Sequence, residues 1–423
     1  MSTGHLLVVG AGQAGAQLIS SVRTLGWDGP ITLVGQEAHA PYARPPLSKA
    51  LLRGAASAGS IGLRSSAFYA EQCVDLVAGE RVERIDLTGA GAGTAESASG
   101  RRWRFDRLAL ATGARPRRLP IGGADLDRVV VLRTLDDALA LAGLLGTAHD
   151  LVVIGGGFVG LEVAATAAAA GVRVTVLEMA PSILNRVVSV QTAAAVQAAH
   201  EATGIGVRTH ACPVRLHTDG RGGVAAVELA DGTVIPADLV LVGIGAHPDD
   251  ELASAAGLRC EGGVVVDSCS RASDGYTLAI GDCANLPDPS TGASGKRLRL
   301  ESVDNAVEQA KAAAATLTGD PRPYRSTPWF WSEQGRLKLQ IAGLASPDDD
   351  VVIRAGKRPG QHIAFRYRGD RMSAVECLNT PADFLAVRAA LAEGISLPRE
   401  AVADTATALK RLQHLGRERP SYH

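Results

Sequence analysis

The chain has 423 residues, of which 46% are hydrophobic, 21% charged and 4% aromatic, and its formal net charge is -1. This length exceeds what one hydrophobic core usually serves, so we expect a globular protein of about two to four domains. The near-neutral charge argues against a nucleic-acid binder or a polybasic membrane anchor. The six cysteines contain no CxxC pair and the ten histidines no ligand spacing, so we predict neither a disulfide framework nor a metal site.

Residues 6–9 form the first apolar run, short and continuous like a fully buried parallel strand, and it leads directly into Gly10-Ala11-Gly12-Gln13-Ala14-Gly15. No basic leader precedes it, so we expect no signal peptide and a cytoplasmic protein. Glycines at this spacing allow a tight turn, close approach of the backbone to a pyrophosphate and close packing of the next helix. A second apolar strand at residues 31–34, with Glu37 beyond it as a candidate ribose acceptor, completes a dinucleotide-binding unit.

Two segments follow before this pattern repeats. Residues 88–100 are small and Gly-rich, so we expect the flexible tip of a hairpin. Residues 108–116, LALATGARP, predict a buried strand that ends in a turn and further mark the first nucleotide site.

The nucleotide-binding pattern returns where the apolar strand at residues 151–154 leads into Gly155-Gly156-Gly157-Phe158-Val159-Gly160. We predict a helix from there to Ala170 and a strand over residues 172–177. One such turn would be weak evidence. Two copies, each between a strand and a helix and each followed by an acidic residue, predict that the chain binds two dinucleotides.

The second copy also carries charges that decide how it is interpreted. Its stretch is apolar enough for a membrane span, but Glu162 and Arg173 lie inside it and indicate a buried strand with a packed helix. Glu178 ends the following strand, where a carboxylate can accept both ribose hydroxyls of an adenosine and would repel a 2′-phosphate. We therefore expect NADH rather than NADPH, with Arg186 keeping NADPH open.

Further elements are expected in the second half of the chain. Residues 276–284 predict another buried strand, ending in Asp282, which can bond the polyol chain of a cofactor. Residues 287–296 predict a polar loop and 348–350, three aspartates, a solvated turn. Four C-terminal strands are predicted over residues 337–342, 351–354, 362–367 and 373–377.

Taken together, these motifs resemble the FAD-dependent ferredoxin reductases that use NADH, and within them the group of putidaredoxin and rhodocoxin reductases. The resemblance covers nearly the whole chain. It is carried by GAGQAG from Gly10, PYARPPLSK from Pro41, ATGARP from Ala111, GGGFVGLE from Gly155, GIG from Gly243, GDCA from Gly281, ESVDNAVEQA from Glu301 and WFWSEQ from Trp329.

The resemblance implies an α/β fold like that of glutathione reductase, with two Rossmann-type dinucleotide-binding domains and a C-terminal α+β domain. One domain is then split by another. Residues 1–112 and 246–324 are expected to bind FAD, residues 113–245 NADH, and residues 325–423 form the C-terminal domain.

The resemblance also implies two sets of cofactor-binding residues. Those expected at FAD are Gly10, Gly12, Gln13, Ala14, Gly15, Glu37, Arg44, Pro45, Lys49, Val82, Ala111, Thr112, Gly113, Arg133, Gly281, Asp282, Glu301, Ser302, Val303 and Trp331. Those expected at NADH are Gly155, Gly157, Phe158, Val159, Gly160, Glu162, Glu178, Arg186, Gly243, Ile244 and Gly245.

Three residues are candidates for a direct part in the chemistry, in which a flavin takes a hydride from NADH and releases single electrons to a [2Fe-2S] ferredoxin. Lys49 resembles the lysine beside the flavin N5, and Glu162 the carboxylate that pairs with it beside the nicotinamide; a plain structural ion pair is the alternative. Trp331 resembles the aromatic residue at the flavin edge, unless it is a core tryptophan. The helix that begins after Glu301 is expected to point its N-terminus at the flavin ring.

Two departures from related enzymes shape these expectations. Phe158 stands where the family usually has tyrosine, so stacking on the nicotinamide is retained and any role of a hydroxyl is lost. Disulfide reductases of this fold carry a redox cysteine pair after the first helix, where this chain reads ARPPLSK. We therefore expect direct transfer from the flavin to the acceptor.

The expected partner is an acidic [2Fe-2S] ferredoxin that serves a cytochrome haem monooxygenase, bound transiently by basic residues. Arg64, Lys311 and Lys338 are the candidates by family position, with ordinary surface charge as the alternative. Three alternatives stay open: service to a ring-hydroxylating dioxygenase, reduction of rubredoxin, and an NADH-responsive signalling role. We expect a monomer or a weak dimer.

Overall fold

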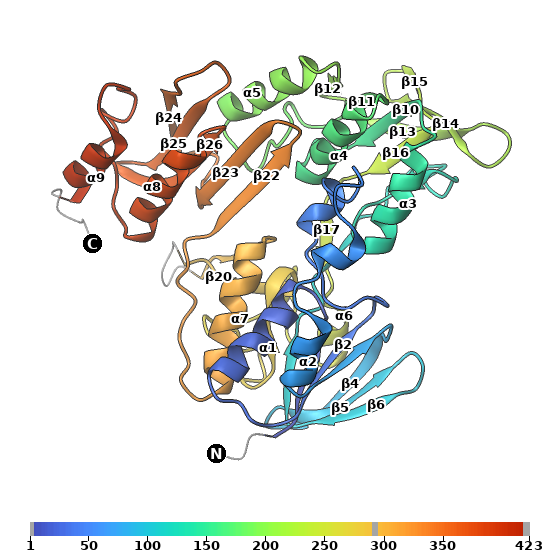
Figure 1. The fold of residues 1–423 in the computed structure, drawn as a ribbon, viewed down its shortest axis with the longest axis vertical. Helices are drawn as coiled ribbons and strands as arrows, with labels where there is room; N and C mark the ends of the chain where they lie inside the picture. Colours follow the sequence, from blue (N-terminus) through green and yellow to red (C-terminus); the bar gives the residue numbers. More distant parts are fainter. Residues whose placement is uncertain (1–3, 290–294, 418–423) are drawn as a thin grey trace. The chain divides into compact units, whose positions relative to one another are not determined.

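The computed structural model describes residues 4–289 and 295–417 (Figure 1). It divides into two compact units, each made of several chain segments. The first unit contains residues 1–44, 57–115 and 246–326, and the second contains residues 45–56, 116–245 and 327–423. Which unit serves which cofactor stays a prediction. No helix of the described residues is long and apolar enough to cross a membrane.

The first unit is built on a five-stranded parallel sheet with the strand order β19-β7-β1-β2-β3. Its strands are β1 (Leu6–Val9), β2 (Ile31–Gly35), β3 (Val74–Ala78), β7 (Arg107–Leu110) and β19 (Leu278–Ala279). Side chains of a strand alternate between faces. Leu6 and Val8 therefore pack with the helices α1 (Gln13–Thr24) and α7 (Val303–Leu317), while Leu7 and Val9 join a second core on the other face. Burial on both faces explains the continuous apolar runs.

A three-stranded antiparallel sheet supplies that second core with side chains. It consists of β4 (Val82–Gly89), β5 (Ala92–Ser97) and β6 (Arg102–Phe105). The expected hairpin is present, but its tip is confined to the turn at residues 89–92, and residues 92–97 of the predicted tip form the packed strand β5. Ala95 is 1% exposed, and a Cβ atom on Gly93 would lie 2.9 Å from the ring of Phe105. The small residues are present because they pack closely, which composition alone does not distinguish from flexibility.

The predicted strand at residues 276–284 is much shorter than expected. Only Leu278 and Ala279 pair with β7, and Tyr276 is 51% exposed. Of the predicted loop over residues 287–296, residues 290–294 lie outside the described residues. The remaining elements of this unit are η2 (Ala58–Ile61), α2 (Ser66–Glu71), β17 (Ala246–Pro248), α6 (Glu251–Ala255), β18 (Val264–Val265), η3 (Gly281–Cys283), β20 (Ala284–Pro287) and β21 (Arg297–Leu298). The strand β8 (Ala114–Pro116) lies where the chain leaves this unit.

The second unit repeats the same construction. Its five-stranded parallel sheet has the order β12-β11-β10-β16-β9, formed by β9 (Val129–Val130), β10 (Asp150–Ile154), β11 (Arg173–Leu177), β12 (Gly206–Arg208) and β16 (Leu239–Val242). Leu151 and Val153 pack in the core that contains α4 (Phe158–Ala169), whereas Val152 and Ile154 pack toward an antiparallel sheet. That sheet consists of β13 (Pro213–Thr218), β14 (Val224–Leu229) and β15 (Val234–Pro236), and the other helices are α3 (Leu135–Leu145) and α5 (Val190–Glu201).

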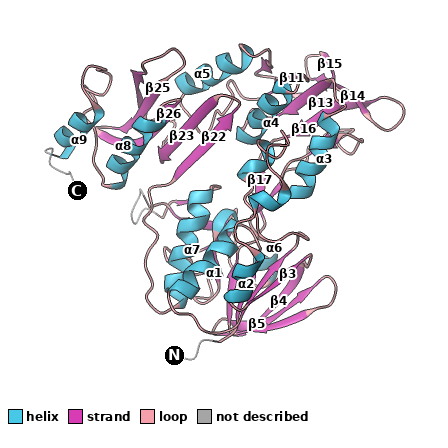
Figure 2. Ribbon diagram, viewed as in Figure 1, coloured by secondary structure: helices cyan, strands magenta, loops and turns pink. Residues whose placement is uncertain are grey.

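The C-terminal part of the second unit is an antiparallel sheet with helices beside it (Figure 2). Its strand order is β22-β23-β26-β25-β24, formed by β22 (Trp329–Gln334), β23 (Leu337–Gly343), β24 (Asp350–Ala355), β25 (His362–Arg368) and β26 (Arg371–Leu378). The helices are α8 (Pro381–Ala392) and α9 (Leu409–Arg417). The four strands predicted in this region are present.

The acidic run at residues 348–350 lies at the expected turn, with Asp348 and Asp350 exposed, and only its middle residue differs from the expectation. Asp349 is buried, and its carboxylate accepts hydrogen bonds from Ser373 Oγ at 2.6 Å and Arg368 Nε at 3.0 Å. A carboxylate with such donors can be buried without leaving an uncompensated charge.

Candidate functional site

The three glycines of the first turn each have a different environment. Gly10 has φ +115°, and a Cβ atom there would collide with the carbonyl oxygen of Ala111. A Cβ atom on Gly15 would collide with the carbonyl oxygen of Gly10, which shows how closely α1 packs on the turn. Gly12 faces no atom within 4 Å. Tight turn, close helix packing and open space over the middle glycine are what a pyrophosphate-binding turn requires.

Neighbouring segments meet at the same edge of the first sheet. Ala111 N donates to Val9 O at 2.7 Å, a Cβ atom on Gly35 would lie 2.6 Å from that of Ala11, and one on Gly281 would lie 3.1 Å from that of Ala14. The structure thus brings together the predicted residues of the GAGQAG, ATGARP and GDCA motifs. The carboxyl ends of parallel strands are where ligands bind in such sheets.

Several other residues predicted at FAD lie at this edge or near it. The Glu37 carboxylate accepts from Arg44 at 2.7 Å and also from the Tyr42 hydroxyl, so it is already oriented two residues past β2. Thr112 Oγ1 donates to Asp249 O at 2.5 Å, and Gly113 follows it. Ser302 caps α7, since its Oγ accepts from Asn305 N at 3.0 Å, which leaves Val303 as the first helical residue.

Five further residues predicted at FAD are placed differently: one lies elsewhere in the first unit and four belong to the second unit. Val82 begins β4 and is buried in the core behind the parallel sheet. Pro45, Lys49, Arg133 and Trp331 belong to the second unit. Their part in FAD binding stays a prediction.

The second turn reproduces the geometry of the first. Gly155 has φ +109°, a Cβ atom on Gly160 would lie 2.5 Å from the carbonyl oxygen of Gly155, and one on Gly157 would have no atom nearer than 4.0 Å. The GIG segment lies against this turn, because Gly243 N donates to Ile154 O at 2.8 Å. The residues of the second unit therefore fit a second dinucleotide.

The acidic residue at the end of β11 is held at the second turn. Glu178 accepts hydrogen bonds from Gly156 N and from Ala180 N, both at 2.8 Å. Its carboxylate is therefore fixed beside the turn, in the place where a ribose is expected. Arg186 is exposed, as is Val159.

The predicted ion pair between Lys49 and Glu162 is present within the second unit. Lys49 Nζ lies 2.6 Å from Glu162 Oε2 and 3.1 Å from Pro45 O. The short turn η1 (Pro45–Ser48) supplies a second donor, since Ser48 Oγ lies 2.5 Å from the same carboxylate oxygen. Ser332 Oγ on β22 donates to Glu162 Oε1 at 2.7 Å.

Aromatic side chains surround the start of α4 and continue along β22. The rings of Phe158 and Phe330 are tilted by 40° with their centres 4.4 Å apart, so Phe158 contacts a neighbouring aromatic side chain, and its stacking on the nicotinamide stays a prediction. Trp331 stacks on Trp329 with the ring centres 5.1 Å apart, and Arg388 lies over the Trp329 ring. Both tryptophans are partly exposed.

Four residues near the ion pair were not predicted: Ser48, Ser332, Gln334 and His200. Ser332 and Gln334 alternate along β22, so strand periodicity would have put them on one face. Nothing local to the sequence connects His200 to them. The hydrogen bond that does so, between His200 Nε2 and Gln334 Oε1 at 2.7 Å, joins residues 134 positions apart.

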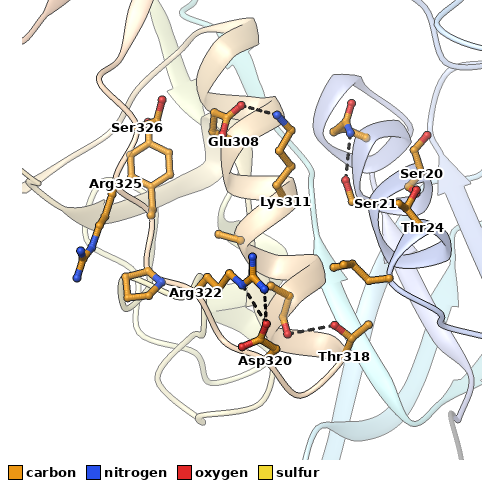
Figure 3. Close-up of a pocket in the computed structure, with 16 residues that line it drawn as sticks. Ser20, Ser21, Thr24, Glu308, Lys311, Thr318, Asp320, Arg322, Arg325 and Ser326 are labelled. Atoms are coloured by element: carbon orange, nitrogen blue, oxygen red, sulfur yellow. Dashed lines mark hydrogen bonds and ion pairs between the residues drawn. The ribbon is translucent and has the colours of Figure 1, made fainter. Parts of the chain in front are cut away.

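A groove of about 510 Å³ lies in the first unit along α1 and α7 (Figure 3). Lys311 lines it and pairs with Glu308 at 2.7 Å, and Arg322 pairs with Asp320 at 2.6 Å on the same wall. Arg64 reaches its rim, since Arg64 Nε donates to Ser20 Oγ at 3.3 Å. Two of the three predicted docking residues thus lie at one groove, while Lys338 is exposed on β23 in the other unit.

The cysteines do not form a dithiol centre. All six are free. Burial raises the pKa of Cys260 to about 11, and it also raises the pKa of Cys283 in the GDCA motif. Both therefore stay as thiols near neutral pH, unlike the thiolates of redox-active cysteines.

Two dinucleotide turns, a lysine paired with a buried glutamate and an added antiparallel domain define a two-cofactor oxidoreductase. Accordingly, residues 4–310 match the family model described as pyridine nucleotide-disulphide oxidoreductase and residues 329–413 the one described as reductase C-terminal. The chain belongs to the pyridine nucleotide-disulphide oxidoreductase family. It is an enzyme that uses FAD and NAD(H).

Within that family the chain resembles one group of reductases. It is 42% identical to rhodocoxin reductase of Rhodococcus erythropolis, over 96% of this chain and 93% of that one. It is 37% identical to putidaredoxin reductase of Pseudomonas putida, over 96% of each. Its fold matches the solved covalent putidaredoxin reductase–putidaredoxin complex with a TM-score of 0.93 and 36% identity, covering 99% of this chain and 100% of that chain.

Proposed function

We propose that this protein is an NADH-dependent ferredoxin reductase that passes electrons from NADH through FAD to a [2Fe-2S] ferredoxin. The observation that carries the proposal is the pair between the partly buried Lys49 and the buried Glu162, at the segment where disulfide reductases carry their cysteines. With ARPPLSK in that place and every cysteine free, no dithiol receives the electrons.

The bound flavin would supply the exchange between a two-electron donor and one-electron acceptors. The residues of the chain would hold and orient the groups that react. The first turn and Glu37 would bind FAD, the second turn and Glu178 NADH, and Lys49 would present a positive charge beside the reacting groups. Water is kept from Glu162 by its burial, which strengthens its interaction with Lys49.

Two relatives that match nearly the whole chain support a ferredoxin as the partner, because they are named rhodocoxin reductase and putidaredoxin reductase. We assign its docking to Arg64, Lys311 and Lys338, which are all exposed. A cytochrome monooxygenase as the final acceptor is part of the proposal. Service to a ring-hydroxylating dioxygenase and reduction of rubredoxin are compatible alternatives, whereas an NADH-responsive signalling role is not favoured by this match to reductases.

We place the protein in the cytoplasm. NADH is produced there, and reduced cysteines are typical of that compartment.

The decisive experiment is NADH-driven reduction of cytochrome c by the purified FAD-loaded protein, with and without an added [2Fe-2S] ferredoxin. We expect the ferredoxin to accelerate the reduction strongly and a rubredoxin to do so less. NADH that bleaches the flavin without any acceleration across several ferredoxins would overturn the ferredoxin proposal. Faster reduction with rubredoxin would favour that alternative.

A further inference from the structure

One face of β22 contacts the helix that follows the second turn. Because strand side chains alternate, Phe330, Ser332 and Gln334 share a face. Residues four apart on a helix also share a face. Phe330 accordingly contacts Phe158, and Ser332 contacts Glu162, one helical turn further along α4. The strand thus lies beside Phe158 and Glu162, which the family resemblance places at the nicotinamide.

A buried chain of hydrogen bonds leads from this face to α5. His200 Nε2 lies 2.7 Å from Gln334 Oε1, Gln334 Nε2 lies 3.1 Å from Ser332 Oγ, and Ser332 Oγ lies 2.7 Å from Glu162 Oε1. The exposed fractions of His200, Gln334, Ser332 and Glu162 are 2%, 3%, 1% and 5%. Water therefore does not complete these contacts.

The chemistry of the groups sets the direction of the chain. An amide oxygen only accepts, so His200 Nε2 carries the hydrogen that it shares with Gln334. The amide nitrogen of Gln334 only donates, so the hydroxyl of Ser332 is left to donate to Glu162. Every hydrogen bond in the chain points toward the carboxylate, and neighbouring hydrogen bonds of this kind polarise one another.

A buried carboxylate needs such donors because burial disfavours its charged form. Lys49 and Ser48 contact only Oε2 of Glu162, so Ser332 supplies the donor for Oε1. Burial lowers the pKa of His200, while its hydrogen bond to Gln334 acts in the opposite direction. A neutral histidine donates through Nε2 without adding a positive charge that would compete with Lys49.

We propose that His200, Gln334 and Ser332 form a positioning relay: it holds Oε1 of Glu162 and thereby orients Oε2 toward Lys49. The relay gives the C-terminal domain a part in the NADH half of the reaction. The relay depends on the proposed function in one respect, because it takes the Lys49–Glu162 pair to serve hydride transfer. None of the three residues is a catalytic residue, because each acts through Glu162.

The central test replaces Ser332 by alanine in the FAD-loaded protein and follows the pKa of Glu162 by infrared spectroscopy, with Glu162→Gln used to assign its carboxyl band. We expect the pKa to rise by about one to two units, as follows from losing a hydrogen bond to a charged group. The rate of flavin reduction at saturating NADH should fall about tenfold, while the Kd for NADH stays unchanged because Glu178 and the second turn are untouched.

Two further variants and two controls separate a relay from general loss of packing. Gln334→Leu and His200→Leu should raise the pKa of Glu162 by progressively smaller amounts, because they act through one and two intervening groups. Glu333→Gln, exposed on the opposite face of β22, and His362→Asn, which removes a histidine bonded to Thr192 on α5, should leave the pKa unchanged. Ser332→Thr keeps the hydroxyl and should restore the wild-type value.

An unchanged Glu162 pKa in Ser332→Ala would overturn the relay, as would shifts of equal size in the controls. Nitrogen NMR of wild-type His200 gives an answer even where a variant fails to fold. The relay requires a neutral ring with its proton on Nε2, and a proton on Nδ1 alone would overturn it. These readouts need no ferredoxin, so a protein that reduces no ferredoxin would contradict the proposed function and leave the relay standing.

Discussion

At the scale of single residues, the glycines of each turn meet the same three requirements: a tight turn, close packing of a helix, and open space over the middle glycine. Gly10 and Gly155 adopt positive φ, and Gly15 and Gly160 admit close packing of a helix. The middle glycines differ from these, because Gly12 and Gly157 have ordinary extended backbones and open space beside them. Only the middle glycines therefore have no structural reason to be glycine, which leaves the ligand as the reason.

This distinction yields a prediction for Gly157→Ala. A methyl group there fits the protein but fills space that the pyrophosphate needs, so we expect an unchanged thermal midpoint, retained FAD and a Kd for NADH raised about 10- to 100-fold. Gly12→Ala is the matched control and should lose FAD while folding normally. Flavin content, NADH titration and thermal unfolding measure the three effects. Normal NADH binding by Gly157→Ala would remove this turn from the nucleotide site.

A second prediction concerns Glu178. Its carboxylate is fixed by two backbone N–H groups, so it is oriented before any ribose arrives. Glu178→Ala should lower kcat/KM for NADH about 10- to 100-fold, as expected for lost hydrogen bonds to a charged group. The substitution should lower kcat/KM for NADPH less, because it also removes the carboxylate that would repel the 2′-phosphate. An unchanged ratio of kcat/KM between NADH and NADPH in Glu178→Ala would exclude Glu178 from the ribose role.

At the scale of elements, α5 is attached to the C-terminal sheet at both ends. At its start Glu376 on β26 accepts from Ser189 N at 2.8 Å and from Ser189 Oγ at 2.6 Å, and it pairs with Arg366 at 2.8 Å. At its end His200 bonds to Gln334 on β22. The helix thus links the C-terminal sheet to the half of the same unit that is proposed to bind NADH.

We therefore predict that Glu376→Ala destabilises the second unit by about 3–5 kcal/mol, because it leaves the Arg366 charge buried without its partner. Denaturant unfolding with a tryptophan signal measures this, since Trp329 and Trp331 lie in the same unit. Glu393→Ala, which breaks the exposed pair with Arg417, is the control and should cost about 0–1 kcal/mol. Equal losses of stability in Glu376→Ala and Glu393→Ala would show that the buried contacts of Glu376 contribute no more than an exposed ion pair.

At the scale of the whole molecule, a net charge of -1 gives no general attraction for an acidic partner, so docking has to depend on local basic residues. Lys311 and Arg64 supply such charge at the groove along α1 and α7, and Lys338 supplies it in the other unit. Rim charges act mainly on the association rate and are screened by salt.

Charge reversal follows from this. Lys311→Glu and Lys338→Glu should each raise the KM for ferredoxin about 3- to 10-fold at low ionic strength, with the difference shrinking as salt is added. Reduction of ferricyanide should be unaffected, because it needs no docking face. Lys357→Glu, another exposed lysine, is the control. A KM that moves equally in all three variants would point to a general charge effect rather than to a docking site.

Prediction from sequence succeeded where the signal lies within a few neighbouring residues. The apolar runs of β1 and β10, the glycine turns and the C-terminal strands are local patterns, and their periodicity follows from backbone geometry. It failed where the same composition suits two structures. Residues 92–97 of the predicted flexible tip form a packed strand, and Asp349 is buried because Arg368 and Ser373 reach it from other strands.

By itself the sequence determined that the chain has two dinucleotide-binding turns and no cysteine pair in the ARPPLSK segment, while its resemblance to ferredoxin reductases implied the Lys49–Glu162 pair. Only the tertiary structure decided what holds that pair. Ser332 lies 170 positions from Glu162, and Gln334 lies 134 positions from His200. Contacts over such separations depend on how β22 packs against α4 and α5, and no local pattern of residues encodes that packing.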